Sequence, residues 1–234
     1  MTPNRPLAWR HGLTQILRIH PPVPVAYDQH SIREAPPHDP QRARRTVLEL
    51  PTVAGIAEEH PPMLRRKIGY PWTADDLDFV TVGCWGSAVH ITDPAFGENG
   101  VDTFNLDDAF EAQAKAHPEA RIIAAVEMGS SAIYGKYLAH VPGAPRLSAD
   151  GWDETYVSGD PVHTLGVCGI DPGGPGTENL DFDNPELLVW SDYLNLIACG
   201  LYATYITERL QVSVFRVTRT EDTQESIEEV WHPE

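Results

Sequence analysis

The sequence predicts an α+β fold, in which a mixed, mostly antiparallel sheet is packed by two main helices behind an extended, proline-rich N-terminal segment. Apolar segments of strand length recur along the chain, and two segments carry clear helix start signals. The order of strands and helices lacks the regular alternation that is typical of parallel sheets. The hydrophobic content of 41% is that of a globular chain.

The N-terminal third has a composition of its own. Residues 12–20 are predicted to form a first strand, and residues 21–41 contain six prolines, which fix φ and remove backbone donors. Residues 42–59 have apolar positions at helical spacing, which a proline divides into two short helices. We therefore divide the chain into an extended, basic head over residues 1–73, which packs on an acidic α+β body over residues 74–234.

The first half of the body is predicted to run strand, strand, helix, strand. Residues 77–84 and 88–92 are β-branched and apolar, as is typical of buried strands. A helix is expected from the N-cap Asn105, with acidic residues in its first turn, to the break at Pro118. Residues 121–126 form the next apolar strand.

The second half of the body contains the strongest helix start signal. Asn184 is a good N-cap, Pro185 suits the first helical position, and Glu186 suits the positive end of the helix dipole. Because apolar residues recur at helical spacing, we expect one long helix over residues 184–210. Strands are expected over residues 132–141, 152–157, 162–170 and 211–218, and a short acidic helix over residues 223–231.

The charge of the chain is unevenly distributed. The formal net charge is -17, yet residues 1–70 hold ten basic and six acidic side chains, whereas residues 146–234 hold four basic and seventeen acidic ones. Nucleic-acid binding needs clustered Lys and Arg on a positive surface, so nucleic acid is excluded as a partner. We expect the few clustered cations to contact the acidic body. They are Arg42, Arg44, Arg45, Arg65, Arg66 and Lys67.

The sequence indicates no membrane association. The most apolar region, residues 187–206, is interrupted by polar residues, and the first twenty residues lack a continuous apolar stretch. The three cysteines are far apart and odd in number, which does not fit a disulfide framework. A cytoplasmic location is expected.

Catalytic candidates begin with Cys84, which follows a predicted strand at a sharp turn. A cysteine in that position can act as a nucleophile, with His90 or His163 as its general base. The alternative is a buried cysteine beside Trp85. A thiolate needs a nearby cation or helix N-terminus, and the sequence shows neither beside Cys84.

No cofactor is predicted from motifs. The ten histidines form no H-E-x-x-H pattern, so a metal site would have to be assembled from distant histidines and carboxylates. The glycine-rich residues 169–176 lack the Lys-Ser/Thr of a phosphate-binding loop.

Binding candidates lie in the acidic loop 171–184 and on the predicted long helix. The loop offers carboxylates for a partner, although a solvated loop is the alternative, and aromatic side chains anchor interfaces if they face outward. The candidates are Asp171, Glu178, Asp181, Asp183, Tyr193 and Tyr202.

The function predicted from these features is that of an acidic protein–protein interaction module. An inhibitor or immunity-type protein that captures a basic partner uses long-range electrostatic attraction in this way. The alternative function is a hydrolase that uses Cys84 or an assembled metal site. A self-associating structural protein is a third class, and the oligomeric state stays open.

Overall fold

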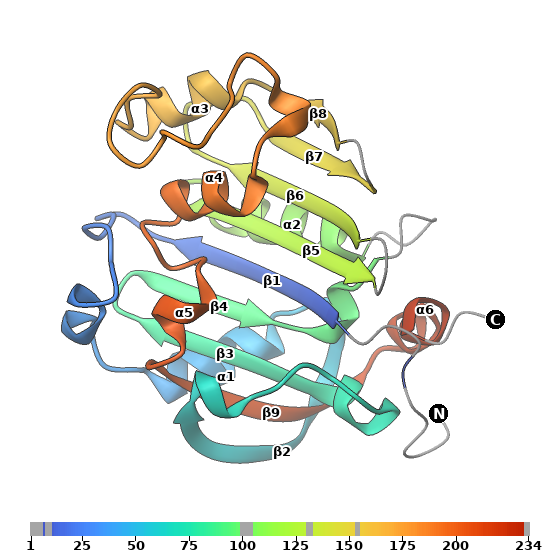
Figure 1. Cartoon of the computed structure of the whole chain (residues 1–234). Helices are drawn as coiled ribbons and strands as arrows, with labels where there is room; N and C mark the ends of the chain where they lie inside the picture. Colours follow the sequence, from blue (N-terminus) through green and yellow to red (C-terminus); the bar gives the residue numbers. More distant parts are fainter. Residues whose placement is uncertain (1–6, 8–10, 99–104, 130–132, 153–154, 232–234) are drawn as a thin grey trace.

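The computed structural model describes residues 7, 11–98, 105–129, 133–152 and 155–231. Within this part of the chain, nine strands form one sheet in the order β2-β9-β3-β4-β1-β5-β6-β7-β8, and every pairing is antiparallel (Figure 1). The predicted α+β class is therefore confirmed, and the sheet dominates it. The strands are β1 (His11–Ile19), β2 (Val53–Leu64), β3 (Phe79–Trp85), β4 (Ala88–Thr92), β5 (Arg121–Gly129), β6 (Ile133–His140), β7 (Leu147–Gly151), β8 (Thr155–Ser158) and β9 (Gln211–Arg219).

The strand β1 lies at the centre of this sheet. Its Ile16 is paired with Ile91 of β4 on one side and with Ala124 of β5 on the other. Residues on both sides of position 73 thus contribute neighbouring strands to a single sheet.

Helices cover both faces of the sheet. Successive residues of a strand point to opposite faces, so Ile16 packs in one apolar layer and Leu17 in the other. In Figure 1, α4 and α5 lie in front of the sheet, and α1 and α2 lie behind it. The helices are α1 (Pro40–Leu48), α2 (Asn105–Ala116), α3 (Pro161–Val167), α4 (Trp190–Ile197), α5 (Thr204–Thr207) and α6 (Glu221–Trp231). Coverage on both faces explains why the central strands are apolar almost throughout.

The predicted strand over residues 162–170 is wrong, because this segment forms α3. Asp160 is its N-cap and accepts a hydrogen bond from the backbone N–H of His163 at 2.9 Å, and Pro161 occupies the first helical position. These two residues are a helix start signal that outweighs the β-branched residues after them.

The predicted long helix over residues 184–210 is also wrong. A 3₁₀ turn at Pro185–Leu187 precedes α4, which ends at Ile197. Cys199 and Gly200 then take positive φ values of 53° and 83°, which an α-helix does not contain. The apolar residues at helical spacing therefore belong to two short helices. The expectation of two main helices is not confirmed, because the described residues form six α-helices.

The prediction for residues 42–59 is correct in its first half only. The segment begins with α1, but residues from Val53 onward form β2, an edge strand paired with β9. The sheet also contains β7, which was not predicted. Among the described residues, no helix is both long and apolar enough to cross a membrane.

Candidate functional site

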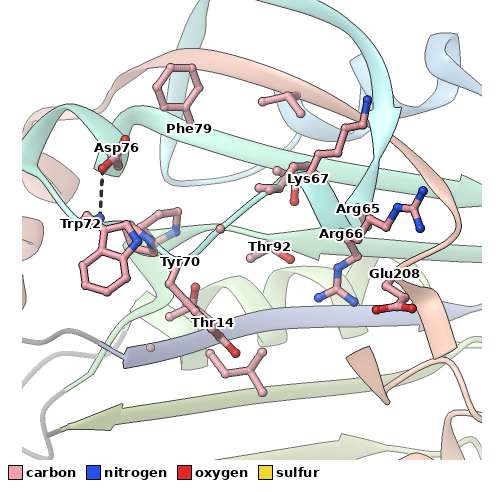
Figure 2. A pocket seen from close by; sticks show the side chains of 18 of the residues that line it. Thr14, Arg65, Arg66, Lys67, Tyr70, Trp72, Asp76, Phe79, Thr92 and Glu208 are labelled. Atoms are coloured by element: carbon pink, nitrogen blue, oxygen red, sulfur yellow. Dashed lines mark hydrogen bonds between the residues drawn. The ribbon is translucent and has the colours of Figure 1, made fainter. Parts of the chain in front are cut away.

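A pocket of about 690 Å³ opens on the face of the sheet that carries α5, over the strands β1, β4, β3 and β9 (Figure 2). Its size is typical of small-molecule sites. The segment from Met63 to Asp76, which begins at the end of β2 and crosses this face, forms the largest share of the wall. The helix α5 and the residue after it add Tyr205 and Glu208.

Hydrogen bonds fix both ends of this covering segment. At one end, in the 3₁₀ turn Arg65–Lys67, Arg65 N–H donates to the carbonyl of Leu210 at 2.9 Å, and Arg66 N–H donates to that of Glu208 at 3.0 Å. At the other end, the 3₁₀ turn Ala74–Asp78 begins with a capping box, in which Asp76 accepts from the backbone N–H groups of Trp72 and Thr73 at 3.0 and 2.9 Å. The wall is therefore held in place before any ligand binds.

Three consecutive cations line the pocket: Arg65, Arg66 and Lys67. Within the described part of the chain, none of them has a carboxylate within 4.0 Å. Arg65 donates a hydrogen bond to the hydroxyl of Thr207, and burial lowers its pKa to about 10. In Figure 2, the guanidinium of Arg66 points toward β1 and lies beside Glu208, whereas Lys67 extends away from β1.

Aromatic side chains line the pocket on the side away from Arg65 and Arg66. Tyr70 and Trp72 are 49% and 57% exposed, although both border a concave surface. Figure 2 shows these two rings across the pocket from the guanidinium groups, with Thr92 between them. Exposed aromatic rings at the edge of a pocket are typical of a surface that a ligand covers.

The floor of the pocket contains an unsatisfied hydroxyl. The oxygen of Thr92 is buried and has no hydrogen-bond partner among the described residues. A buried hydroxyl without a partner costs free energy, so a ligand that bonds to it would recover that cost.

The structure does not bring the predicted catalytic residues together. Cys84 is fully buried on the face of α1, and burial raises the pKa of its thiol to about 11. His90 is buried on the opposite face, where its Nε2 lies 2.8 Å from Oε1 of Gln15, and burial, followed by the charge of Arg65, holds its pKa well below the usual value. His163 is exposed on α3.

The predicted binding residues fall into two groups. The four acids of the loop are exposed, and the side chains of Asp171, Glu178 and Asp181 each accept a hydrogen bond from a nearby backbone N–H; Asp171, for example, accepts from the N–H of Gly173 at 3.0 Å. Tyr193 and Tyr202 are buried, and the Tyr193 hydroxyl donates to the carbonyl of Pro161 at 3.0 Å. Neither tyrosine faces outward, so the condition for an aromatic anchor is not met.

The sequence predicts no pocket, and the basic residues that line this one are expected from the sequence to contact the acidic body instead. The run Arg65–Lys67 stands out as a basic cluster, but Tyr70 and Trp72 gave no signal beyond their proximity to it. The floor residues come from strands far away in the sequence, and only the pairing of those strands brings them together. A separate group that could hold a metal ion, composed of His20, His117 and Glu119, lies beyond the far end of β1.

The fold and the pocket define an α+β protein with a nine-stranded antiparallel sheet and a cation-lined pocket on one face. The chain belongs to the family described as "Family of unknown function (DUF6333)", whose model matches residues 1–234. No curated protein and no solved structure matches the chain.

Proposed function

We propose that this protein binds a small organic anion that carries a planar ring, in the pocket beneath the segment from Met63 to Asp76. One observation carries the proposal: cations that have no carboxylate partner among the described residues face exposed aromatic rings across a preformed pocket. Pockets that combine apolar walls with a few polar groups are the usual form of a small-molecule site.

Each wall suits one part of such a ligand. The guanidinium of Arg66 would bond to the anionic group, because charge-assisted hydrogen bonds to carboxylate or phosphate are short and strong. The positive charge of Arg65 would add to the electrostatic attraction of the anion. Trp72 and Tyr70 would stack on the ring, and the hydroxyl of Thr92 would bond to a polar atom between the two ends.

The electrostatic setting favours a small anion over a polymer. The net charge of -17 repels an extended polyanion such as nucleic acid, whose many phosphates would lie beyond the pocket. Within the pocket, Asp76 and Glu208 are the two acidic lining residues, and the capping box occupies Asp76. The cations therefore dominate locally.

The test is a binding titration with adenosine 5′-monophosphate and 4-hydroxybenzoate as ring-bearing anions, followed by tryptophan fluorescence and calorimetry. Two control compounds each carry one part of the ligand: adenosine has the ring without the charge, and inorganic phosphate has the charge without a ring. We expect at least one ring-bearing anion to bind more tightly than either half. The loss of one charged hydrogen bond costs about 1.5–3 kcal/mol, so Arg66→Ala should weaken binding by roughly 10- to 100-fold.

The matched control is Arg33→Ala, because Arg33 is an exposed arginine in a different 3₁₀ turn, Ser31–Glu34. It should leave the affinity unchanged. Equal affinity of Arg66→Ala and the wild-type protein for every ring-bearing anion would refute the proposal, as would the absence of binding by both anions.

A second proposal, the capture of a basic protein partner, rests on the acidic loop 171–184. Its carboxylates are exposed, and no described Lys or Arg lies within 4.0 Å of Asp171, Glu178, Asp181 or Asp183. In this proposal, the protein acts in the cytoplasm as an inhibitor or immunity-type protein. The free thiols of Cys84, Cys168 and Cys199 support that location.

This second proposal predicts association with a defined basic protein, such as lysozyme or cytochrome c, at low ionic strength. The association should disappear at high salt, and the fourfold substitution of the loop acids by Asn or Gln should weaken it. A fourfold variant that binds as tightly as the wild-type protein would eliminate the loop as the binding surface.

A further inference from the structure

Three potential metal ligands converge where β1 ends. His20 follows β1 directly, and His117 and Glu119 lie in the connection between α2 and β5. One ring nitrogen from each histidine and one carboxylate oxygen all lie within 4.8 Å of one another. Nδ1 of His20 is 3.1 Å from Oε1 of Glu119, and the two imidazole rings meet edge to face with centroids 5.0 Å apart.

We infer that His20, His117 and Glu119 form a binding site for a divalent transition metal such as Zn²⁺. Two imidazoles and one carboxylate are a ligand set that suits this class of ion. Zinc lies about 2.0–2.2 Å from such ligands, so the donor atoms of a tetrahedral site are roughly 3.3 Å apart. The donor atoms, which all lie within 4.8 Å of one another, would have to move closer together to reach that geometry.

Backbone hydrogen bonds hold two of the ligands in position. The N–H of His20 donates to the carbonyl of Ser87 at 3.0 Å, which fixes the chain where it leaves the sheet. The N–H of His117 donates to the carbonyl of Gln113 at 2.9 Å, and the carbonyl of His117 accepts from Ala120 at 3.0 Å. Backbone hydrogen bonds therefore hold the site together, although His20 is 97 positions from His117 and 99 positions from Glu119 in the sequence.

The electrostatic surroundings are mixed but compatible with a cation. The positive charge of Arg18 acts on both His20 and His117. The guanidinium of Arg18 is hydrogen-bonded to Gln113. Its repulsion of a metal is opposed by the carboxylates of Glu119 and Glu49, which both act on His117.

Three protein ligands leave at least one coordination position open. The side chains of His20 and Glu119 are 22% and 54% exposed, so water can reach a bound ion. A three-ligand site with an open position is typical of catalytic and exchangeable zinc, whereas structural zinc is enclosed by four ligands. This site is separate from the pocket, because it lies beyond the C-terminal end of β1 and the pocket lies over the N-terminal end.

The experiment is calorimetry of the chelator-treated full-length protein with Zn²⁺, together with the visible absorption of Co²⁺ as a probe of coordination. We expect one equivalent to bind with micromolar or tighter affinity. His117→Ala and Glu119→Gln should each weaken binding at least tenfold, because even the loss of a group that hydrogen-bonds to a metal ligand costs about 10- to 100-fold in affinity. His163→Ala, which removes an exposed histidine on α3, is the control and should bind as the wild-type protein does.

Far-ultraviolet circular dichroism establishes whether each variant is folded, and Glu119→Gln alters only an exposed side chain. Absence of stoichiometric Zn²⁺ binding by the wild-type protein would overturn the inference. Unchanged affinity in both His117→Ala and Glu119→Gln would overturn it as well.

Discussion

A buried ion pair lies on the face of the sheet opposite the pocket. Arg219 of β9 donates to both carboxylate oxygens of Asp93, at 2.8 and 3.0 Å, and both side chains are at most 1% exposed. Thr52 donates to the same carboxylate at 2.6 Å, and Arg219 also donates to the carbonyl of Leu77 at 2.6 Å. Four segments of the chain meet in this network, so its charges are largely satisfied.

Removal of one partner from this pair should destabilise the fold strongly. We expect Arg219→Met to lower the free energy of unfolding by about 3–5 kcal/mol, because it leaves the carboxylate of Asp93 buried without a counter-charge. Urea denaturation measures this change. The control is Arg216→Met on the same strand, where the arginine is exposed and 3.9 Å from Asp78, and where a change of at most about 1 kcal/mol is expected. Equal effects of the two substitutions would contradict the assignment.

The thiol of Cys84 should be inert in the native protein. With its pKa raised to about 11, the thiol is protonated at neutral pH, and only the thiolate reacts with alkylating reagents. We expect iodoacetamide to modify Cys84 only after denaturation, whereas the partly exposed Cys168 should react earlier. Mass spectrometry of the modified peptides separates the two sites. Rapid native alkylation of Cys84 would support the predicted role of this residue as a nucleophile.

At the scale of elements, the sequence pattern predicts the central strands of the sheet better than its edge strand β2. The strands β3, β4 and β5 are predicted because both of their faces are covered, so their sequences are apolar almost throughout. The edge strand β2 was missed because its outer residues are polar and it contains two prolines, which an edge strand tolerates. The pocket escaped prediction for a related reason, since its floor exists only after distant strands have paired.

The break after α4 gives a test at this scale. Gly200 has a φ of 83°, and a Cβ at this position would lie 2.2 Å from the carbonyl oxygen of Tyr27. We expect Gly200→Ala to destabilise the protein by at least about 1–3 kcal/mol, which is the usual cost of backbone strain alone.

The matched control is Gly166→Ala in α3, where a Cβ meets no atom within 4 Å. Replacement of a helical glycine by alanine should stabilise the protein by roughly 0.5–1 kcal/mol. Thermal or chemical unfolding resolves the opposite signs. A continuous helix through position 200 would instead make both substitutions stabilising.

At the scale of the whole molecule, the charge of the chain acts through its distribution. The net charge of -17 opposes compaction through self-repulsion, and the exposed acids of the loop 171–184 and of α6 contribute to it. This surplus of acidic residues follows from the sequence alone, because it is obtained by counting the charged side chains. It could not predict that Arg65, Arg66 and Lys67 would stay without carboxylate partners among the described residues in so acidic a chain.

Salt should therefore stabilise the protein. Because the Debye length falls from about 30 Å at 0.01 M to about 8 Å near physiological ionic strength, NaCl screens the repulsion between distant carboxylates. We expect the melting temperature to rise by a few degrees over this range. The fourfold substitution of the loop acids should reduce that rise. A melting temperature that falls with salt would show that attractive surface pairs outweigh the repulsion.

The order of strands in the sheet also governs when the protein can fold during its synthesis. The edge strand β2 has one neighbour, β9, which the ribosome adds about 150 residues later. Until then β2 has no strand to pair with, and β3 lacks its neighbour on that side. The wall of the pocket, whose anchoring carbonyls belong to Glu208 and Leu210, is held only in the same late interval. A nascent chain therefore acquires the wall of this pocket late in its folding, and a chaperone that shields β2 and β3 would act in that interval.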